Sequence, residues 1–456
     1  MEFMYNHKVR IYRVCLFFTG LLILSAFVLL SSGCSRITEN PEKVGTVDQA
    51  SEKPTSESPT PTRPIPTIAL LVYTPTPSPI ITVTPVPVIE VNPQLIGEIE
   101  LWHPYQTGSL EKAAMDQVVE DAGIMFPNLS LTVLEVPASE IGRDYQIDFV
   151  AGSGPDLMIM NNDQLGNMAL SGFVEEITLE PDQSSGQFAP QTIAGLQVDG
   201  RLYGLPKSYS SVILYYRKSM LETAPRTTEE LLEMVRGGKT FVSVLSSYHL
   251  FGWAGAFGGN LFDGNMRCIA DQSGWVEALN YLVELKSAGA LFVGDHQAAE
   301  QMFLNGDKAL LVNGSWELNK YIEAFGDDLG AIILPQGPAA GAVPLIGVEG
   351  VFLNPNSQYK DAALEVARFI TSPLSMKEFM DISHLLPARK DIDSQNEYYL
   401  ALGKPSINGM AIPQDEEFTN YWLPFGDMFV SVLNGEISAA EGVSRACSLL
   451  NSANGK

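Results

Sequence analysis

Three polar residues follow a short apolar run, and their side chains have the chemistry of a ligand-binding site. Asn161, Asn162 and Asp163 come directly after the predicted strand Leu157–Met160 and precede a predicted helix. Their amide and carboxylate groups can hydrogen-bond a hydroxylated ligand. The same position also suits capping of the helix by Asn162 or Asp163. Both interpretations stay open from the sequence.

Aromatic residues follow other predicted strands in the same way. Trp102, Tyr105 and Gln106 lie at the end of an alternating run that starts at Ile96. Trp316 follows the predicted strand 309–312 and an Asn-Gly-Ser turn, a position typical of a cleft edge or of core packing. The glycine-rich segment YHLFGWAGAFGGNLFD contains Tyr248 and Trp253, whose rings we expect to serve as stacking surfaces.

The stretch DGRLYGLPKSYSSVILYYRKSM, residues 199–220, is a candidate connection between two lobes. The pattern predicts a strand at 201–205 and a second, buried strand at 212–216. Pro206 and the polar residues 207–211 between them predict a kink. This pattern fits an edge strand with a polar bend, or a hinge that lines a cleft with Tyr209 and Ser210.

The order of the predicted elements indicates how these residues are positioned. A strand at 96–102, a helix at 109–122 and a strand at 129–136 form a βαβ unit. We therefore expect a mainly parallel sheet in the first lobe, with ligand groups beyond the carboxyl ends of its strands. The whole chain reads as an α/β protein.

The sequence gives little support for an enzyme. Asp163, Glu349 and Asp427 could be combined into the carboxylate pair that a glycoside hydrolase requires. However, the sequence has no GxSxG motif, and no spacing of Cys or His residues resembles a catalytic or metal site. We expect no enzymatic activity, no metal and no cofactor.

The composition is that of an exported acidic protein. The chain has 456 residues and a net charge of −25, and the charges of residues 1–91 cancel, so the remainder carries all of it. Such an acidic body is not expected to bind nucleic acid. Its length predicts two or three domains.

The amino terminus has the layout of a lipoprotein signal. Basic residues precede an apolar run at 14–30, and the run ends in LLSSGCSR. We expect a signal peptide at 1–33 and a lipid on Cys34, with an uncleaved membrane anchor as the alternative. Residues 34–95, rich in Pro, Thr and Ser, are predicted to be an extended tether. The body then lies at the outer face of the cell membrane, extracellular or periplasmic.

Two cysteines, Cys268 and Cys447, remain in the exported body. An oxidising compartment favours a disulfide between them, although two buried free thiols are the alternative.

Six segments, in this order, resemble the extracellular solute-binding proteins of ABC importers, in the branch that includes maltose-binding protein: GPDLMIMNNDQLG, DGRLYGLPKSYSSVILYYRKSM, FLNGDKALLVNGSW, LPQGP, PLIGVEGVFLNPNS and FTNYWLPFGD. The resemblance covers about residue 96 to the carboxyl terminus. It implies the two-lobed periplasmic-binding-protein fold of type II, with a mixed sheet flanked by helices in each lobe and a hinge between them. The implied first lobe is residues 96–208 plus 349–395, and the second is 213–344 plus 400–456.

The resemblance also implies a site in the cleft between the lobes. Residues 208–211 and 347–350 fall on hinge crossings, Asp163 on an acidic sugar-binding position, and Trp316 and Trp422 on sugar-stacking positions. Both cysteines fall in the second lobe, so we expect a disulfide. The candidate ligand-binding residues are Trp102, Tyr105, Gln106, Asn162, Asp163, Tyr209, Ser210, Tyr248, Trp253, Trp316, Glu349, Tyr421 and Trp422.

The function that the resemblance implies is the capture of a sugar or oligosaccharide for an importer. The expected partners are the carbohydrate and the transmembrane permease subunits, with the binding protein itself a monomer. Polyols, peptides and polyamines are alternative ligands. In the first loop and at Ser210 the chain lacks the charged residues of the maltose branch, which argues against maltose itself but not against sugars.

Overall fold

The computed structural model describes residues 91–179, 187–402 and 409–456. The predicted signal peptide, Cys34 and nearly all of the predicted tether lie outside these ranges. In the part of the chain that is described, no helix has the length and apolar character required to cross a bilayer.

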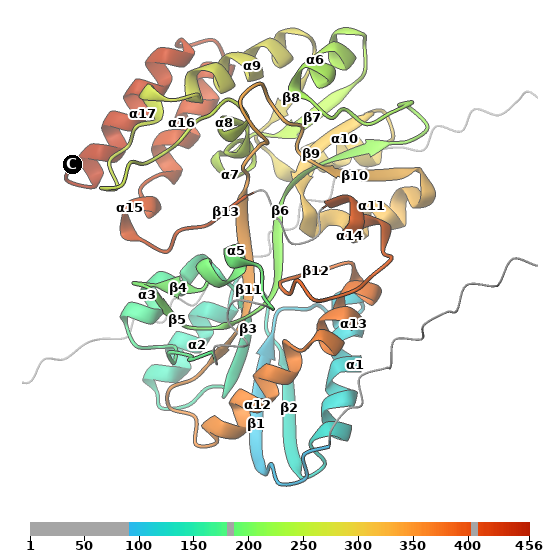
Figure 1. Cartoon of the computed structure of the whole chain (residues 1–456), viewed down its shortest axis with the longest axis vertical. Helices are drawn as coiled ribbons and strands as arrows, with labels where there is room; N and C mark the ends of the chain where they lie inside the picture. Colours follow the sequence, from blue (N-terminus) through green and yellow to red (C-terminus); the bar gives the residue numbers. More distant parts are fainter. Residues whose placement is uncertain (1–90, 180–186, 403–408) are drawn as a thin grey trace, which may run out of the picture. The chain divides into compact units, whose positions relative to one another are not determined.

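One strand, β6 (Leu205–Arg217), takes part in both halves of the sheet system (Figure 1). Its first part pairs with β11 (Leu345–Leu353) and its last part pairs with β9 (Leu310–Gly314) and β10 (Leu329–Ile333), all antiparallel. We call the strands that pair around the first part of β6, with their helices, lobe 1, and those around its last part lobe 2. The lobe boundaries given above remain a prediction.

Lobe 1 has the predicted βαβ unit at its start. The strands β1 (Gly97–His103) and β2 (Leu129–Glu135) pair in parallel along their whole length, and α1 (Leu110–Met125) connects them. Ser109 caps α1 by accepting a hydrogen bond from the backbone N–H of Lys112. The remaining elements of lobe 1 are α2 (Ile141–Val150), β3 (Leu157–Asn161), η1 (Asn162–Gln164), α3 (Leu165–Leu170), α5 (Pro190–Ala194), β4 (Gln197–Val198), β5 (Arg201–Leu202), α12 (Lys360–Ile370), α13 (Pro373–Ser383), β12 (Leu386–Pro387) and β13 (Met410–Ala411).

Lobe 2 has a second sheet, in which β7 pairs in parallel with β8 and β9. Figure 1 shows α16 and α17 side by side at its outer end, next to α9. Its other elements are α6 (Thr228–Arg236), β7 (Phe241–Val244), α7 (Ser247–Leu250), α8 (Gly252–Ala256), η2 (Ala270–Gln272), α9 (Trp275–Ser287), β8 (Leu291–Val293), α10 (His296–Leu304), η3 (Ser315–Glu317), α11 (Leu318–Phe325), η4 (Gly326–Asp328), α14 (Glu397–Leu402), α15 (Glu416–Thr419), α16 (Trp422–Leu433) and α17 (Ala439–Ala453).

The structure has one strand, β6, from Leu205 to Arg217 where the sequence predicted a separate strand on each side of the segment 206–211, and the irregularity at Pro206 is a change of register. The pairing with β11 shifts register by one residue here, so that Ser208 faces Glu349 while Pro206 faces Gly350. A β-bulge of this kind leaves one residue unpaired and tolerates a proline that cannot donate a hydrogen bond. The strand therefore carries its polar middle section through the hinge in extended form.

The prediction of stacking surfaces throughout the glycine-rich segment is also wrong. The segment folds into the short helices α7 and α8, and the Trp253 side chain is only 1% exposed, with its ring 5.6 Å from that of Tyr281. The glycines permit this packing, since a Cβ on Gly255 would lie 2.5 Å from Val343. Trp253 is thus a residue of the lobe 2 core and not a ligand-binding residue.

The structure joins Cys268 and Cys447 in a disulfide, with Cα atoms 5.4 Å apart and a sequence separation of 179. The connection links the loop before α9 to the carboxyl-terminal helix α17. The Asn451 side chain adds to it, because it accepts from the backbone N–H of Cys268 and donates to the carbonyl of the same residue.

Replacing both cysteines with alanine is expected to lower the free energy of unfolding by about 2 to 5 kcal/mol, since the disulfide restricts a long loop in the unfolded chain. Thermal denaturation of the oxidised protein and the variant measures this loss. Ligand affinity below the melting transition should be unchanged, because neither cysteine lines the cleft cavities described below. An unchanged melting temperature would contradict the prediction.

Candidate functional site

A carboxylate whose side chain is only 12% exposed, that of Glu349, lies where β11 meets β6. Its Oε2 atom accepts hydrogen bonds from the Tyr105 hydroxyl at 2.7 Å, the Ser208 hydroxyl at 2.8 Å and the Lys207 ammonium at 2.9 Å. The Lys207 side chain has no exposed surface and also lies over the ring of Phe379, 3.6 Å from its centroid. This ion pair connects the first loop, the bulged strand and β11.

The surroundings keep Glu349 ionised. Burial alone would raise the pKa of its carboxyl group, but the Lys207 ammonium and the three hydrogen bonds outweigh burial and hold that pKa below its usual value. Burial lowers the pKa of Lys207, and the charge of Glu349 opposes this change. For Tyr105, burial and then the nearby carboxylate raise the hydroxyl pKa, so it stays a donor.

A cavity of about 140 Å³ opens beside this ion pair. Lobe 1 contributes Asn161, His384 and Leu386 to its lining, β6 contributes Tyr209 and Ser210, and lobe 2 contributes Trp316. The Trp316 side chain is 40% exposed. Its ring lies against the end of β9, where a Cβ on Gly314 would be 2.2 Å from it, so only glycine leaves room.

A larger cavity of about 640 Å³ lies next to it and is lined from both lobes. Tyr248 and Trp422 form one wall, while Asp163, Asn167 and Gln414 contribute polar groups. The Tyr248 ring is 5.7 Å from that of Trp316 and 6.4 Å from that of Trp422, nearly parallel to the latter. Trp316, Tyr248 and Trp422 therefore form an aromatic row that passes from one cavity to the other.

Asp163 is exposed where two cavities meet. It lines the larger cavity and also a third one, of about 240 Å³, beside Pro104 and Gln164. The protein atoms around its carboxylate raise its pKa by desolvation. Asp163 lies inside η1 and is not a cap residue, since the N-cap positions of η1 and α3 are Asn161 and Gln164.

The model of the bacterial extracellular solute-binding protein family matches residues 117–399. The chain belongs to this family. This solute-binding protein is 27% identical over 304 residues to a maltotriose-binding protein of Pyrococcus abyssi (strain GE5 / Orsay), a match that covers 63% of this chain and 66% of that protein.

Two further likenesses extend the comparison. A galactooligosaccharide-binding protein of Bacillus subtilis (strain 168) is 23% identical over 345 residues, which cover 70% of this chain and 82% of that protein. The crystal structure of a cyclo/maltodextrin-binding protein complexed with maltotetraose matches with a TM-score of 0.69 at 22% identity, covering 78% of this chain and 97% of that one. The structural match establishes the two-lobed fold of the family.

Three of the predicted site residues are buried in this solute-binding protein and hydrogen-bond to other residues of the chain. Trp102 is buried and donates from Nε1 to Glu100. Tyr421 is fully buried, and its hydroxyl donates to the Ser247 carbonyl. Asn162 is also fully buried, donating to the Gly195 carbonyl and accepting from the Val348 backbone N–H. Their polar groups are occupied within the protein, so these residues support the cleft without offering groups to a ligand.

The other predicted residues fall into two groups. Tyr209, Ser210, Tyr248, Trp316, Glu349, Trp422 and Asp163 line the cavities. Tyr105 reaches the site only through Glu349, and Gln106 is exposed without lining any of the three cavities. The sequence prediction omitted Lys207, Gln414 and His384. The signal for Lys207 was its place in the polar middle of β6, but nothing in the sequence pairs it with Glu349.

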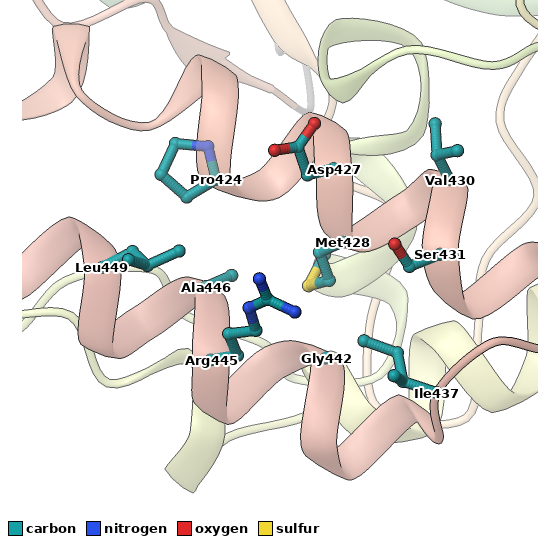
Figure 2. Close-up of a pocket in the computed structure, with 10 residues that line it drawn as sticks. All are labelled: Pro424, Asp427, Met428, Val430, Ser431, Ile437, Gly442, Arg445, Ala446 and Leu449. Carbon is teal, nitrogen blue, oxygen red and sulfur yellow. The ribbon is translucent and has the colours of Figure 1, made fainter.

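The carboxylates considered for a hydrolase do not share a site. Asp163 and Glu349 line different cavities, and Glu349 is held by Lys207. Asp427 lines a separate groove of about 210 Å³ between α16 and α17, together with Arg445 and Leu449 (Figure 2). No residue of the aromatic row lines that groove.

The ion pair generates a stability prediction. Lys207→Met should lower the free energy of unfolding by about 3 to 5 kcal/mol, because it leaves the Glu349 carboxylate buried without its cation. Urea denaturation measures the loss. The matched control is Lys377→Met, which removes an exposed partner of Asp381 and should cost less than about 1 kcal/mol. Equal losses in the two variants would contradict the assignment.

The ion pair of Lys207 and Glu349 also predicts that the free energy of unfolding depends on pH in the acid range. The folded protein lowers the pKa of Glu349, so its stabilising contribution is present above the unfolded carboxyl pKa of about 4.3 and is lost as the pH falls through the lower folded value. Glu349→Gln should make the free energy of unfolding depend less on pH in this range.

Proposed function

We propose that this protein is a lipid-anchored, extracytoplasmic receptor that binds a sugar or oligosaccharide between its lobes for an ABC importer. The observation that carries the proposal is the aromatic row, which faces polar groups of lobe 1 across cavities lined by both lobes. Sugar rings have apolar C–H faces and hydroxyl edges, so they require this combination. The family is one of binding proteins, and we assign the chain no catalytic role.

The names of the similar proteins favour an oligosaccharide over a monosaccharide. They record maltotriose, galactooligosaccharide and maltotetraose as ligands of those proteins. The aromatic row here spans two adjoining cavities, which suits a ligand of more than one ring. Because the named sugars differ in their linkages, we propose the oligosaccharide class and not a particular member.

The cellular setting in this proposal comes from the sequence. The lipid on Cys34 and the tether at 34–95 would hold the receptor at the outer face of the membrane, where it meets the permease subunits. The receptor needs no cofactor in this role and acts as a monomer.

A cationic ligand is the second candidate. Glu416 of α15 lines the larger cavity together with Asp163 and the aromatic row, and a polyamine combines with such a site through ion pairs and cation–π contacts. Titration with spermidine beside the oligosaccharides separates the two candidates. Binding of spermidine alone would replace the sugar proposal.

Sugar binding and its dependence on the aromatic row form the central prediction. Maltotriose, maltotetraose and a galactotriose should be titrated by calorimetry, and at least one should bind with one-to-one saturation and without turnover. Trp422→Ala and Trp316→Ala should each weaken that binding about a hundredfold, since each ring buries aromatic surface against the sugar.

The control for these variants is Trp275→Phe. Trp275 is buried in the lobe 2 core against Phe425 and lines neither cavity, so its replacement should lower stability and leave affinity unchanged. Alanine variants at 316 and 422 that bind as tightly as the parent would show that the sugar binds elsewhere.

We also predict that the lobes close on the sugar. Polar groups of lobe 1 and rings of lobe 2 line the same cavity. A ligand therefore contacts both sets of groups only when the two lobes approach each other. These additional contacts favour the closed state. Small-angle scattering at saturating ligand should show a smaller radius of gyration. The Trp422→Ala variant at the same ligand concentration is the comparison, and an unchanged radius for the saturated parent would contradict closure.

A further inference from the structure

A second cluster of polar side chains lies in lobe 2 outside the cleft cavities. His296 and Glu300 are four residues apart on α10, and Glu317 lies on η3. One side-chain nitrogen or oxygen atom of each lies within 4.8 Å of the others. An imidazole and two carboxylates from two separate elements are the donor types that bind zinc.

The Nε2 atom of His296 shares its hydrogen-bond partner, Asn313, with a second histidine. That atom is 2.9 Å from Oδ1 of Asn313, which already accepts from the Gly314 backbone N–H at 2.8 Å and contacts His249 Nε2 at 3.1 Å. The hydroxyl of Ser246 lies 2.8 Å from His249 Nδ1, so His249 can accept there and carry its proton on Nε2. Asn313 Oδ1 has two lone pairs, and these two donors fill them. His296 Nε2 can therefore release Asn313 at little cost.

Glu300 is the second unsatisfied group. The residue is only 5% exposed, and its Oε1 atom is buried without a hydrogen-bond partner, 3.7 Å from His296 Nε2. The other oxygen accepts from the Lys320 ammonium at 3.0 Å, and Glu317 lies 2.5 Å from the same ammonium. One lysine thus serves two carboxylates, and the buried oxygen beside the imidazole has no donor.

We propose that His296, Glu300 and Glu317 form a binding site for a divalent transition-metal ion of the zinc type. The mixed nitrogen and oxygen donor set suits zinc, whereas Ca²⁺ and Mg²⁺ favour oxygen ligands alone. The ion takes the place of the Lys320 ammonium, whose side chain is 45% exposed and can turn into solvent. No Cys or His spacing in the sequence resembles a metal site, and these ligands come from two elements with a single histidine among them.

The site is linked to the cleft through the chain itself. Glu317 follows Trp316 directly in η3, and the His249 ring lies 5.9 Å from the Trp316 ring. A bound ion fixes Glu317, so it also restricts the neighbouring tryptophan. The intrinsic fluorescence of Trp316 therefore reports occupancy without any sugar present.

A proton is the competing occupant. A protonated His296 would form an ion pair with Glu300, and the cluster would then only hold α10 against η3. Calorimetric titration of the protein with ZnCl₂ at pH 7.5 separates the two cases. The proposal expects one saturable high-affinity site and a fluorescence change that Trp316→Phe removes. Titration with MgCl₂ is expected to give neither signal.

Variants locate the bound ion. His296→Gln and Glu300→Gln should each weaken this zinc binding at least about tenfold, as expected for loss of a ligand. Glu323→Gln, an exposed residue of the same α11 that carries Lys320, is the matched control and should bind as the parent does. Zinc binding that survives His296→Gln unchanged would place the ion elsewhere and overturn the proposal.

Lys320→Met gives a test that does not depend on losing a ligand. Without zinc this variant should melt below the parent, because two carboxylates lose their shared cation. With zinc its melting temperature should recover, and it should bind zinc more tightly than the parent because the competing ammonium is gone. A loss of stability that zinc does not restore, together with no saturable site in the parent, would show that the cluster is an ion-pair network only.

Discussion

The arrangement of the cleft depends on one buried charge, the carboxylate of Glu349. A charge taken out of water at this depth is tolerated only when a counter-charge and hydrogen-bond donors surround it. Lys207 and Ser208 from the bulged part of β6 and Tyr105 from the end of β1 supply them. All three donors bind one oxygen atom. They therefore fix the loop after β1, the bulge and β11 relative to one another. The β-bulge is compatible with this arrangement, since it leaves Lys207 without a paired residue on β11 while its side chain reaches Glu349.

Other hydrogen bonds divide the hinge into a fixed part and a freer part. On the lobe 1 side Asn162 accepts from the Val348 backbone N–H and donates to the Gly195 carbonyl. On the lobe 2 side Ser211 makes two hydrogen bonds, since its hydroxyl donates to the Leu345 carbonyl and its N–H donates to the Ser315 hydroxyl. Between these two anchored regions Ser210 faces Gly347 across the strand pair. Glycine has the widest range of backbone conformations, so a change of strand direction costs least there.

The sequence predicted the elements of the fold well and the roles of individual side chains less well. Local patterns were sufficient for the βαβ unit and for Trp316 after its turn. They could not separate stacking rings from core rings in YHLFGWAGAFGGNLFD, because Gly252 and Gly255 serve helix packing against Pro344 and Val343. Local patterns also could not show which of the neighbours Asn162 and Asp163 is exposed. Asn162 is buried, and Asp163 is exposed in the cleft. The contact between Lys207 and Glu349 spans 142 residues, and no local signal in one strand identifies a partner that far away.

The two walls of the cleft contribute to binding in different ways. Tyr248 and Trp422 pack against the lobe 2 core, and Trp422 also contacts the rings of Phe418 and Tyr421, so this part of the aromatic row is in place before any ligand arrives. A preformed apolar wall gives much of its contact energy in the open state as well as in the closed state. Polar groups of lobe 1, such as Asp163 and Asn167, can reach a ligand on that wall only after the lobes approach. Only contacts that differ between the two states shift the equilibrium between them. On the proposed function, the aromatic wall sets the affinity of the first encounter, and the polar wall determines how completely the lobes close.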